Sequence, residues 1–212
     1  MKKILLPALL VAALFGAPAT FAHKAPASVA AKAIAVYKLQ PQLSTLGWEG
    51  KAVTHGHNGT MQFSGGDLQV ENGKVVGGMA TVDMKTMKAT DITDAENHAK
   101  FVGHMSGDDF FGAEKYPTST FKITSIKPIA GAAANADNAT ITGEMTIKGI
   151  AQTISFPAKV GVKNGIAAAT GKVTIDRTKF GLKYGSKSFF DSLGDKAIYD
   201  DFTLAFNIVA KQ

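Results

Sequence analysis

The sequence contains no cysteine, a single tryptophan and, among 23 basic residues, a single arginine. Without cysteine the chain can form no disulfide, no thiolate nucleophile and no cysteine metal site. A domain without disulfides must depend on a hydrophobic core, and 212 residues are enough to build one. Thiol enzymes, disulfide scaffolds and lipid attachment to an N-terminal cysteine are therefore excluded.

Long hydrophobic runs are also scarce, and the one present lies at the beginning of the chain. Two lysines precede the apolar stretch Ile4 to Phe15, and small residues follow it up to Ala22. This pattern predicts a signal peptide over residues 1–22, with cleavage after Ala22 or Ala19, and a flexible leader over residues 23–34. No later stretch is apolar enough to span a membrane. We therefore expect the mature protein in the periplasm, or secreted.

The charge of the chain is modest, with a formal net value of +6. Most lysines fall on the polar side of alternating segments, so no concentrated basic patch points to a nucleic acid. The lone arginine, Arg177, is more informative, because its planar fork suits bidentate contacts that lysine cannot make. Two roles stay open for it: it clamps a carboxylate of the fold, or it holds the head group of a ligand.

From residue 35 onward the sequence alternates apolar and polar residues with the period of a half-buried strand. The clearest example is Ala139 to Gly149, and the Asn72-Gly73 and Asn164-Gly165 pairs suit tight hairpin turns. The expected strands are 35–40, 44–53, 57–63, 67–71, 74–84, 119–129, 139–147, 152–162, 167–176 and 197–210, some of them continuous with one another. We predict an all-β fold, a closed antiparallel barrel of eight strands over residues 35–212, since closure removes exposed edges.

One region interrupts the strand pattern. Residues 93–103 are typical of a short helix, with Thr93 as its N-cap and Gly103 as its end. Residues 106–111 continue it as a turn with two adjacent aromatic residues. This helical insertion is expected near one mouth of the barrel.

Motifs of catalysis are weak in this sequence. Ser119 to Lys122 matches the S-x-x-K string of serine acyl enzymes, but it lies in an expected strand and not at the helix start that this chemistry requires. His55 and His57 share one face of a strand, whereas His98 and His104 do not share a helix face. A zinc site would need distant residues to converge, so we expect neither a metal nor a cofactor.

A set of short strings, in order and at consistent spacing, resembles one known family from about residue 35 to the C-terminus. The strings are Trp48 to Lys51, His57 to Gly59, Gly77-Gly78, Val82 to Met84, Gly103 to Ser106, Asp109 to Phe111, Tyr116-Pro117, Thr120-Phe121, Gly143 to Gly149, Asp176 to Gly181 and Asp200-Asp201. The chain is similar to the YceI-like family of exported, lipocalin-like proteins. The resemblance implies an eight-stranded barrel with a helical lid, an apolar tunnel for polyisoprenoids or similar long-chain amphiphiles, and no established enzymatic activity.

Candidate site residues follow from the many large apolar side chains on expected inward faces, since a closed sheet of this length has more inward surface than a small core fills. The expected tunnel lining is Trp48, Phe63, Met84, Phe101, Phe110, Phe111, Phe121, Met145, Ile147, Phe180 and Phe206. The candidates for head-group contacts at the mouth are His57, His104 and Arg177. No catalytic residue is assigned.

Three hypotheses for function remain after this reasoning. The first is an exported binding protein that carries or stores an isoprenoid-type or similar amphiphilic lipid such as a quinone, with a stress-related role as an extension. The alternative is a hydrolase-type enzyme that uses the mouth histidines with an acid on the same barrel. A third is a stress-related module that recognises another protein through an exposed apolar patch. Homodimerisation is open by analogy with barrels of this type.

Overall fold

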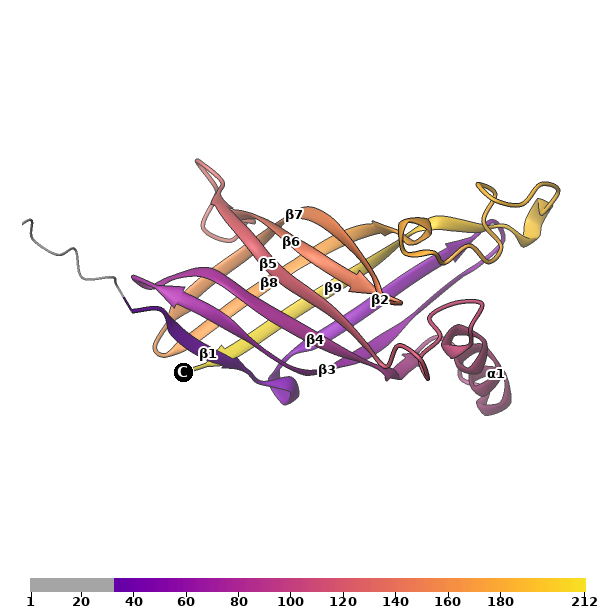
Figure 1. The fold of residues 1–212 in the computed structure, drawn as a ribbon, viewed down its shortest axis with the longest axis horizontal. Coiled ribbons are helices and arrows are strands. Elements are labelled where there is room, and N and C mark those ends of the chain that lie inside the picture. Colours follow the sequence, from indigo (N-terminus) through magenta and orange to yellow (C-terminus); the bar gives the residue numbers. More distant parts are fainter. Residues whose placement is uncertain (1–32) are drawn as a thin grey trace, which may run out of the picture. The chain divides into compact units, whose positions relative to one another are not determined.

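A computed structural model describes residues 33–212 of the chain. The predicted signal peptide, and the leader up to residue 32, lie outside the described residues. The described part consists almost entirely of strands, with one α-helix and three short 3₁₀ helices (Figure 1).

The strands confirm the alternating pattern of the sequence. They are β1 (Ala35–Leu39), β2 (Thr45–Ala52), β3 (Gly56–Glu71), β4 (Lys74–Ala89), β5 (Thr118–Pro128), β6 (Ala139–Ile147), β7 (Ile150–Lys163), β8 (Ile166–Asp176) and β9 (Ile198–Lys211). The two segments expected at 57–63 and 67–71 form one continuous strand, β3. Gly65 and Gly66 lie inside β3 beside an irregular step in its pairing with β4.

The sheet closes on itself into an antiparallel barrel with eight strand positions. Its nine strands follow the order β1-β3-β2-β9-β8-β7-β6-β5-β4, and β3 also pairs with β4, which completes the circle. Both β1 and β2 lie between β3 and β9, with Tyr37 opposite Leu68 and Leu46 opposite Met61. They therefore form one strand position, interrupted by the 3₁₀ helix η1 (Pro41–Leu43). The predicted fold class is confirmed.

Three tight hairpins connect neighbouring strands. Asn72-Gly73 and Asn164-Gly165 have positive φ angles at both residues, as the sequence predicted for tight turns of this type. Lys148-Gly149 makes the third, with φ angles of 50° and 75°. A lysine gives no turn signal of its own, so this hairpin was not recognised in the sequence.

The helical insertion forms α1 (Ala95–Ser106), which lies at one end of the barrel (Figure 1). The prediction of its ends was wrong by a few residues. Asp94, not Thr93, caps the helix, because its carboxylate accepts the backbone N–H of Asn97 at 2.9 Å. Gly103 does not end the helix, which continues to Ser106 because glycine in a helix interior is costly but tolerated.

The two ends of the barrel differ in how they are filled. The end that holds the β3–β4 and β7–β8 hairpins is packed by a cluster of buried apolar side chains: Tyr37, Leu68, Val70, Val75, Ala167 and Ala210. We call this cluster the floor. The other end, the mouth, holds α1, the β2–β3 turn, and the segment between β8 and β9 with its 3₁₀ helices η2 (Arg177–Phe180) and η3 (Gly194–Lys196).

Candidate ligand-binding cavity

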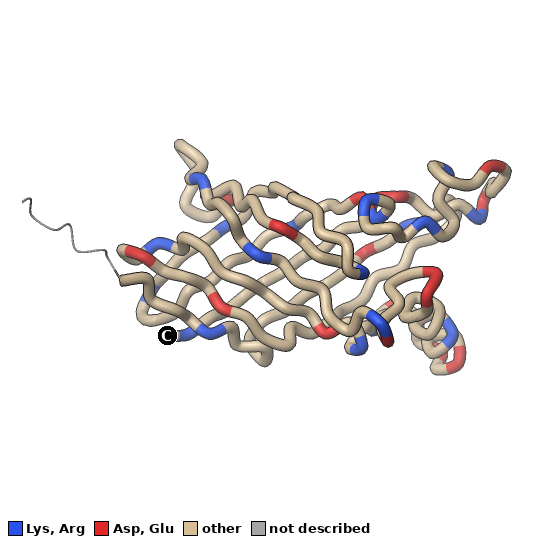
Figure 2. The backbone as a smooth tube through the Cα atoms, in the orientation of Figure 1, with Lys and Arg blue, Asp and Glu red and all other residues tan. Residues whose placement is uncertain are grey.

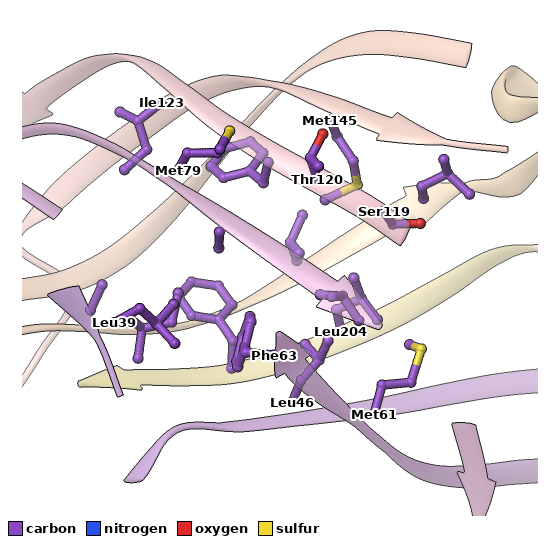
Figure 3. A pocket seen from close by; sticks show the side chains of 18 of the residues that line it. Leu39, Leu46, Met61, Phe63, Met79, Ser119, Thr120, Ile123, Met145 and Leu204 are labelled. Carbon is purple, nitrogen blue, oxygen red and sulfur yellow. The ribbon is translucent and has the colours of Figure 1, made fainter. Parts of the chain in front are cut away.

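The middle of the barrel encloses an apolar cavity of about 110 Å³, which we call the inner chamber. Figure 3 shows side chains from strands around the barrel, among them Leu46, Phe63 and Met145, around this space. Among residues 33–212, the polar residues in its lining are Asp67, Ser119 and Thr120. The hydroxyl of Ser119 lies 3.1 Å from the sulfur of Met84 and is satisfied there. The chamber therefore favours hydrocarbon.

Two glycines at inward-facing positions keep this chamber open. Gly143 lies between Ile141 and Met145 on the inner face of β6, and a Cβ there would come within 2.4 Å of Cζ of Phe121. Gly171 lies opposite Phe206, and a Cβ on it would come within 2.8 Å of that ring's Cζ. The end of each ring thus occupies space that the side chain of any other residue at the glycine position would take.

A second cavity, of about 270 Å³, lies between the barrel and α1, and we call it the outer chamber. Met61, Phe111 and Phe202 line both chambers, so the two adjoin. Its remaining lining comes from β2, the β2–β3 turn, the beginning of β3, β4, α1 and the residues after it, the segment after β8 and the first residues of β9. It includes histidine, tyrosine, lysine and aspartate. Polarity thus rises from the inner chamber to the mouth.

Trp48 positions the helix over the outer chamber. Its ring stacks on that of Phe101 of α1, with centroids 6.1 Å apart and planes 16° apart. It also lies directly over Gly59 of β3, where a Cβ would come within 2.6 Å of the indole ring. Its Nε1 is buried without a hydrogen-bond partner, one of two such side-chain atoms among residues 33–212. An unpaired buried donor is costly unless a bound molecule supplies an acceptor.

His57 forms the best-defined polar contact of the outer chamber. Its Nδ1 lies 2.8 Å from Oδ2 of Asp91, and the Asn58 N–H donates to the other oxygen of that carboxylate at 3.2 Å. Partial burial raises the pKa of Asp91, but the hydrogen bonds from His57 and the backbone outweigh it, so the net pKa is lowered. The imidazole packs on Phe101, with a centroid distance of 4.5 Å. His57 is therefore held in a fixed orientation.

His104 is less constrained. Its Nε2 lies 4.0 Å from a carboxylate oxygen of Asp109, and its ring contacts Phe110 and Tyr184 edge-on. No serine, threonine or cysteine lines the outer chamber in the part of the chain that the structure describes. Nor do three or more His, Asp or Glu side chains gather there into a group that could hold a metal ion.

Arg177 is buried, and its guanidinium donates to backbone carbonyls of the fold. Nε donates to Tyr199 O at 3.0 Å, Nη1 to Leu182 O at 2.7 Å and Nη2 to Ile198 O at 3.1 Å. Nη2 also lies 3.5 Å from the carboxylate of Asp200. Burial lowers the pKa of Arg177, and the nearby Asp200 and Asp176 oppose this. The side chain ties η2 to the beginning of β9, in agreement with the structural one of its two predicted roles, although it also borders the outer chamber.

The structure distributes the residues predicted for the site between the two chambers. Phe63, Met84, Phe121, Met145, Ile147 and Phe206 line the inner chamber, Phe111 lines both, and Trp48, Phe101, Phe110, His57, His104 and Arg177 line the outer chamber. Phe180 lines neither, because η2 turns its ring into the core, where it is 1% exposed. The sequence reasoning missed aliphatic members such as Leu46 and Leu204, which the same alternation marks as inward, and the rim tyrosines Tyr184 and Tyr199.

Comparison with known proteins agrees with this arrangement. A model of the YceI-like domain matches residues 37–210. The chain belongs to the YceI-like family. A UPF0312 protein of Pseudomonas aeruginosa is 32% identical over 96 residues, which are 41% of this chain and 46% of the relative. Protein YceI of Escherichia coli O157:H7 is 34% identical over 64 residues, 30% of each chain. The matches thus span less than half the length of these curated YceI-like relatives.

Solved structures share the YceI-like barrel. Burkholderia cenocepacia BcnA has a TM-score of 0.63 at 23% identity, over 82% of this chain and 99% of BcnA. A polyisoprenoid binding domain from Saccharophagus degradans has a TM-score of 0.55 at 16% identity, over 82% of this chain and 97% of that domain. At these identities the likeness shows the fold. Among the described residues, no helix is long and apolar enough to cross a membrane.

Proposed function

We propose that this protein binds a long-chain amphiphilic lipid of the isoprenoid type, with its hydrocarbon chain in the inner chamber and its head group in the outer chamber. The observation that carries the proposal is the inner chamber itself: an apolar space inside the barrel that adjoins a chamber with polar groups. The likeness to a polyisoprenoid binding domain supports the same class of ligand.

The energetics suit a carrier. Burying on the order of 10 methylenes at ~0.8 kcal/mol each contributes roughly 8 kcal/mol before ordering costs, which corresponds to about micromolar affinity. The inner chamber is small, but its lining includes Met61, Met84 and Met145, whose unbranched side chains can change rotamer to admit more chain. Longer chains would bind more tightly and extend into the outer chamber.

A head group with a hydrogen-bond acceptor fits the outer chamber best. Nε1 of Trp48 is a donor without a partner, and the fixed His57 can donate from Nε2 when its ring is protonated. Carbonyl oxygens of quinones and oxygens of phosphate both satisfy this requirement. His104 is a second candidate from the α1 side of the chamber.

We further propose that the protein is exported and acts in the periplasm as a carrier or store of this lipid, with a stress-related role as an extension. The support is the sequence of residues 1–22, which has the basic, apolar and small-residue regions of a signal peptide. N-terminal sequencing of the secreted protein tests this, with His23 as the expected first residue.

The decisive experiment is native mass spectrometry of the freshly purified mature protein, followed by organic extraction and lipid analysis. We expect a stoichiometric adduct that the extract identifies as an isoprenoid-type lipid. A protein that is empty on purification, and remains empty when offered quinones and prenyl phosphates, contradicts the proposal.

One observation favours a second candidate function, a hydrolase that acts on the head group. The contact of His57 with Asp91 resembles the base–carboxylate pair of many hydrolases. Among residues 33–212 no serine, threonine or cysteine lines the chamber, so the reaction considered is attack by a water molecule that His57 activates. Conversion of an added prenyl phosphate to the free alcohol, abolished in His57→Ala, would support it. Recovery of the unchanged lipid after prolonged incubation would exclude this reaction.

A further inference from the structure

Exposed aromatic side chains gather at the mouth of the barrel. Five phenylalanine and tyrosine residues are exposed among residues 33–212; four of them lie between residues 184 and 199, and Tyr116 is the fifth. The four are Tyr184, Phe189, Phe190 and Tyr199, with exposed fractions of 44, 47, 50 and 53%. We call them the aromatic rim. Single exposed apolar residues are ordinary, whereas a cluster marks a surface that contacts something.

The aromatic rim is continuous with the outer chamber. Tyr184 and Tyr199 line that chamber, and Phe189 and Phe190 lie on the segment that joins η2 to β9. Figure 1 shows this segment, in orange to yellow, extending beyond the ends of the strands at the same end as α1. A surface that contacts the rim would therefore face the opening of the outer chamber.

The segment is tied to the barrel through its backbone and small polar side chains. The Ile198 N–H donates to Gly185 O at 2.8 Å, and Ser188 Oγ donates to the Asp200 carboxylate at 2.5 Å. The N–H groups of Phe189 and Phe190 both donate to the carbonyl of Ser186, a residue that is fully buried. These bonds and the buried Ser186 hold the segment in place, while the rings of Phe189 and Phe190 are about half exposed to solvent among its charged side chains.

Charge contributes less than the rings. Lys183 lies over the ring of Phe189, with Nζ 4.7 Å from the centroid, and Lys187 lies two residues before Phe189 in the sequence. Asp191 and Asp195 lie on the same segment, which with Lys196 has three lysines and two aspartates. Figure 2 shows blue and red residues mixed there. The aromatic rings, and not the net charge, are therefore the main feature by which this surface would bind a partner.

We propose that the aromatic rim docks the mouth of the barrel on the surface of a lipid bilayer. Phenyl and phenol rings partition well into the interface between head groups and acyl chains. The proposal rests on the proposed function, because a lipid that is nearly insoluble in water must pass between a bilayer and the cavity. A rim that inserts beside the opening of the outer chamber gives that lipid a path that avoids water.

Sedimentation of the mature protein with sucrose-loaded vesicles of phosphatidylethanolamine and phosphatidylglycerol tests the docking. We expect the wild type to bind and the double variant Phe189→Ser/Phe190→Ser to bind about tenfold or more weakly, since two half-exposed rings lose their transfer into lipid. The matched control is Val76→Ser/Ile166→Ser, which removes two exposed apolar side chains (39% and 40% exposed) next to hairpins at the floor end. The control should bind as the wild type does, and high salt should weaken binding only slightly.

A second measurement separates docking from lipid binding. Native mass spectrometry of the same variants, loaded with lipid in detergent, should show equal equilibrium occupancy, while transfer from vesicles slows in the Phe189→Ser/Phe190→Ser variant only. If the wild type carries lipid but does not sediment with vesicles, or if both double variants bind equally, the docking proposal is overturned and the proposed function stands. If the protein never carries lipid but sediments through Phe189 and Phe190, the docking stands and the proposed function fails. If the aromatic rim binds a protein partner instead, the wild type should carry lipid but should not sediment with vesicles.

Discussion

At the scale of single residues, the interior is shaped as much by glycine as by the aromatic residues that stand out in the sequence. Phe121 and Phe206 are large enough to fill the inner chamber, yet each ring lies over a glycine of a neighbouring strand. An alanine at either glycine would push a ring off the wall and into the space. We infer that Gly143 and Gly171 set the bore of the inner chamber.

The first prediction concerns Gly171→Ala. The new methyl group would come within 2.8 Å of Phe206 Cζ and 3.1 Å of Ala158 Cβ, so the ring must turn into the chamber. We expect the affinity for cis-parinaric acid to fall about tenfold, because about two methylenes of its chain would no longer be buried in the chamber. Fluorescence titration measures this.

Gly161→Ala is its matched control, because Gly161 lies in the neighbouring strand β7 and nothing approaches within 4 Å of a Cβ there. It should bind the probe as the wild type does. Equal affinity of the two variants would show that the bore does not depend on Gly171.

The second prediction concerns Arg177→Lys. One ammonium cannot reach the three carbonyls that the guanidinium fork satisfies, so buried acceptors lose their donors. We expect a loss of about 2–4 kcal/mol in the free energy of unfolding. Urea denaturation followed by tryptophan fluorescence measures it, with Lys179→Ala, an exposed position of the same turn, as the control. If the variant keeps its stability but loses lipid, Arg177 holds the head group instead.

At the scale of elements, alternation of apolar and polar residues predicted the strands well because barrel strands are buried on one face only. It did not settle which ranges are continuous, as 57–63 and 67–71 are through Gly65 and Gly66 of β3. It also gave no turn where Lys148 takes a left-handed conformation.

The cavity was harder to predict than the strands. Phe180 and Phe206 are the same residue type, and both were expected in the tunnel lining. Phe180 packs in the core, whereas Phe206 lines the inner chamber. Which inward residue meets empty space depends on how strands far apart in sequence close the barrel.

The third prediction concerns pH and the corner where η2 meets β9. Partial burial raises the pKa of Asp200, but hydrogen bonds from Ser186 and Ser188 and the charge of Arg177 outweigh it, so the folded-state pKa lies below the ordinary value of 3.8. Because the pKa of Asp200 is lower in the folded protein than in the unfolded chain, its ionised carboxylate stabilises the fold at pH values above the unfolded-state pKa. This stabilisation is lost as the pH falls through the folded-state pKa.

The melting temperature of the wild type should therefore fall as the pH drops from about 5 towards 3, with Asp200 and Asp91 both contributing. In Asp200→Asn the melting temperature should be lower at pH 7 and should change less over this range. Thermal melts by circular dichroism at several pH values measure it. Asp137→Asn, in the exposed loop between β5 and β6, is the control, and an unchanged pH profile in Asp200→Asn would contradict the assignment.

At the scale of the whole barrel, closure and polarity act together. Pairing of β3 with β4 leaves no open edge along the sheet, and the floor cluster closes one end. The other end keeps two adjoining chambers in place of a solid core, lined increasingly by polar groups towards the rim. A cavity of this kind forgoes packing contacts, so the empty barrel is less stable than the filled one.

The last prediction follows from that difference. A ligand that binds only the folded barrel stabilises it by about 2.7 kcal/mol when its free concentration is ~100 times Kd, and this should raise the melting temperature by about 5–10 °C. At one fixed free ligand concentration, the shift should grow with chain length in a series of prenyl alcohols, because each added methylene that is buried lowers Kd, and it should level off when the chain has filled both chambers. Differential scanning calorimetry with short, medium and long members measures the series, with Gly171→Ala levelling off earlier than the wild type. A shift that is independent of chain length, or equal in the two proteins, would place the lipid on the outside of the barrel.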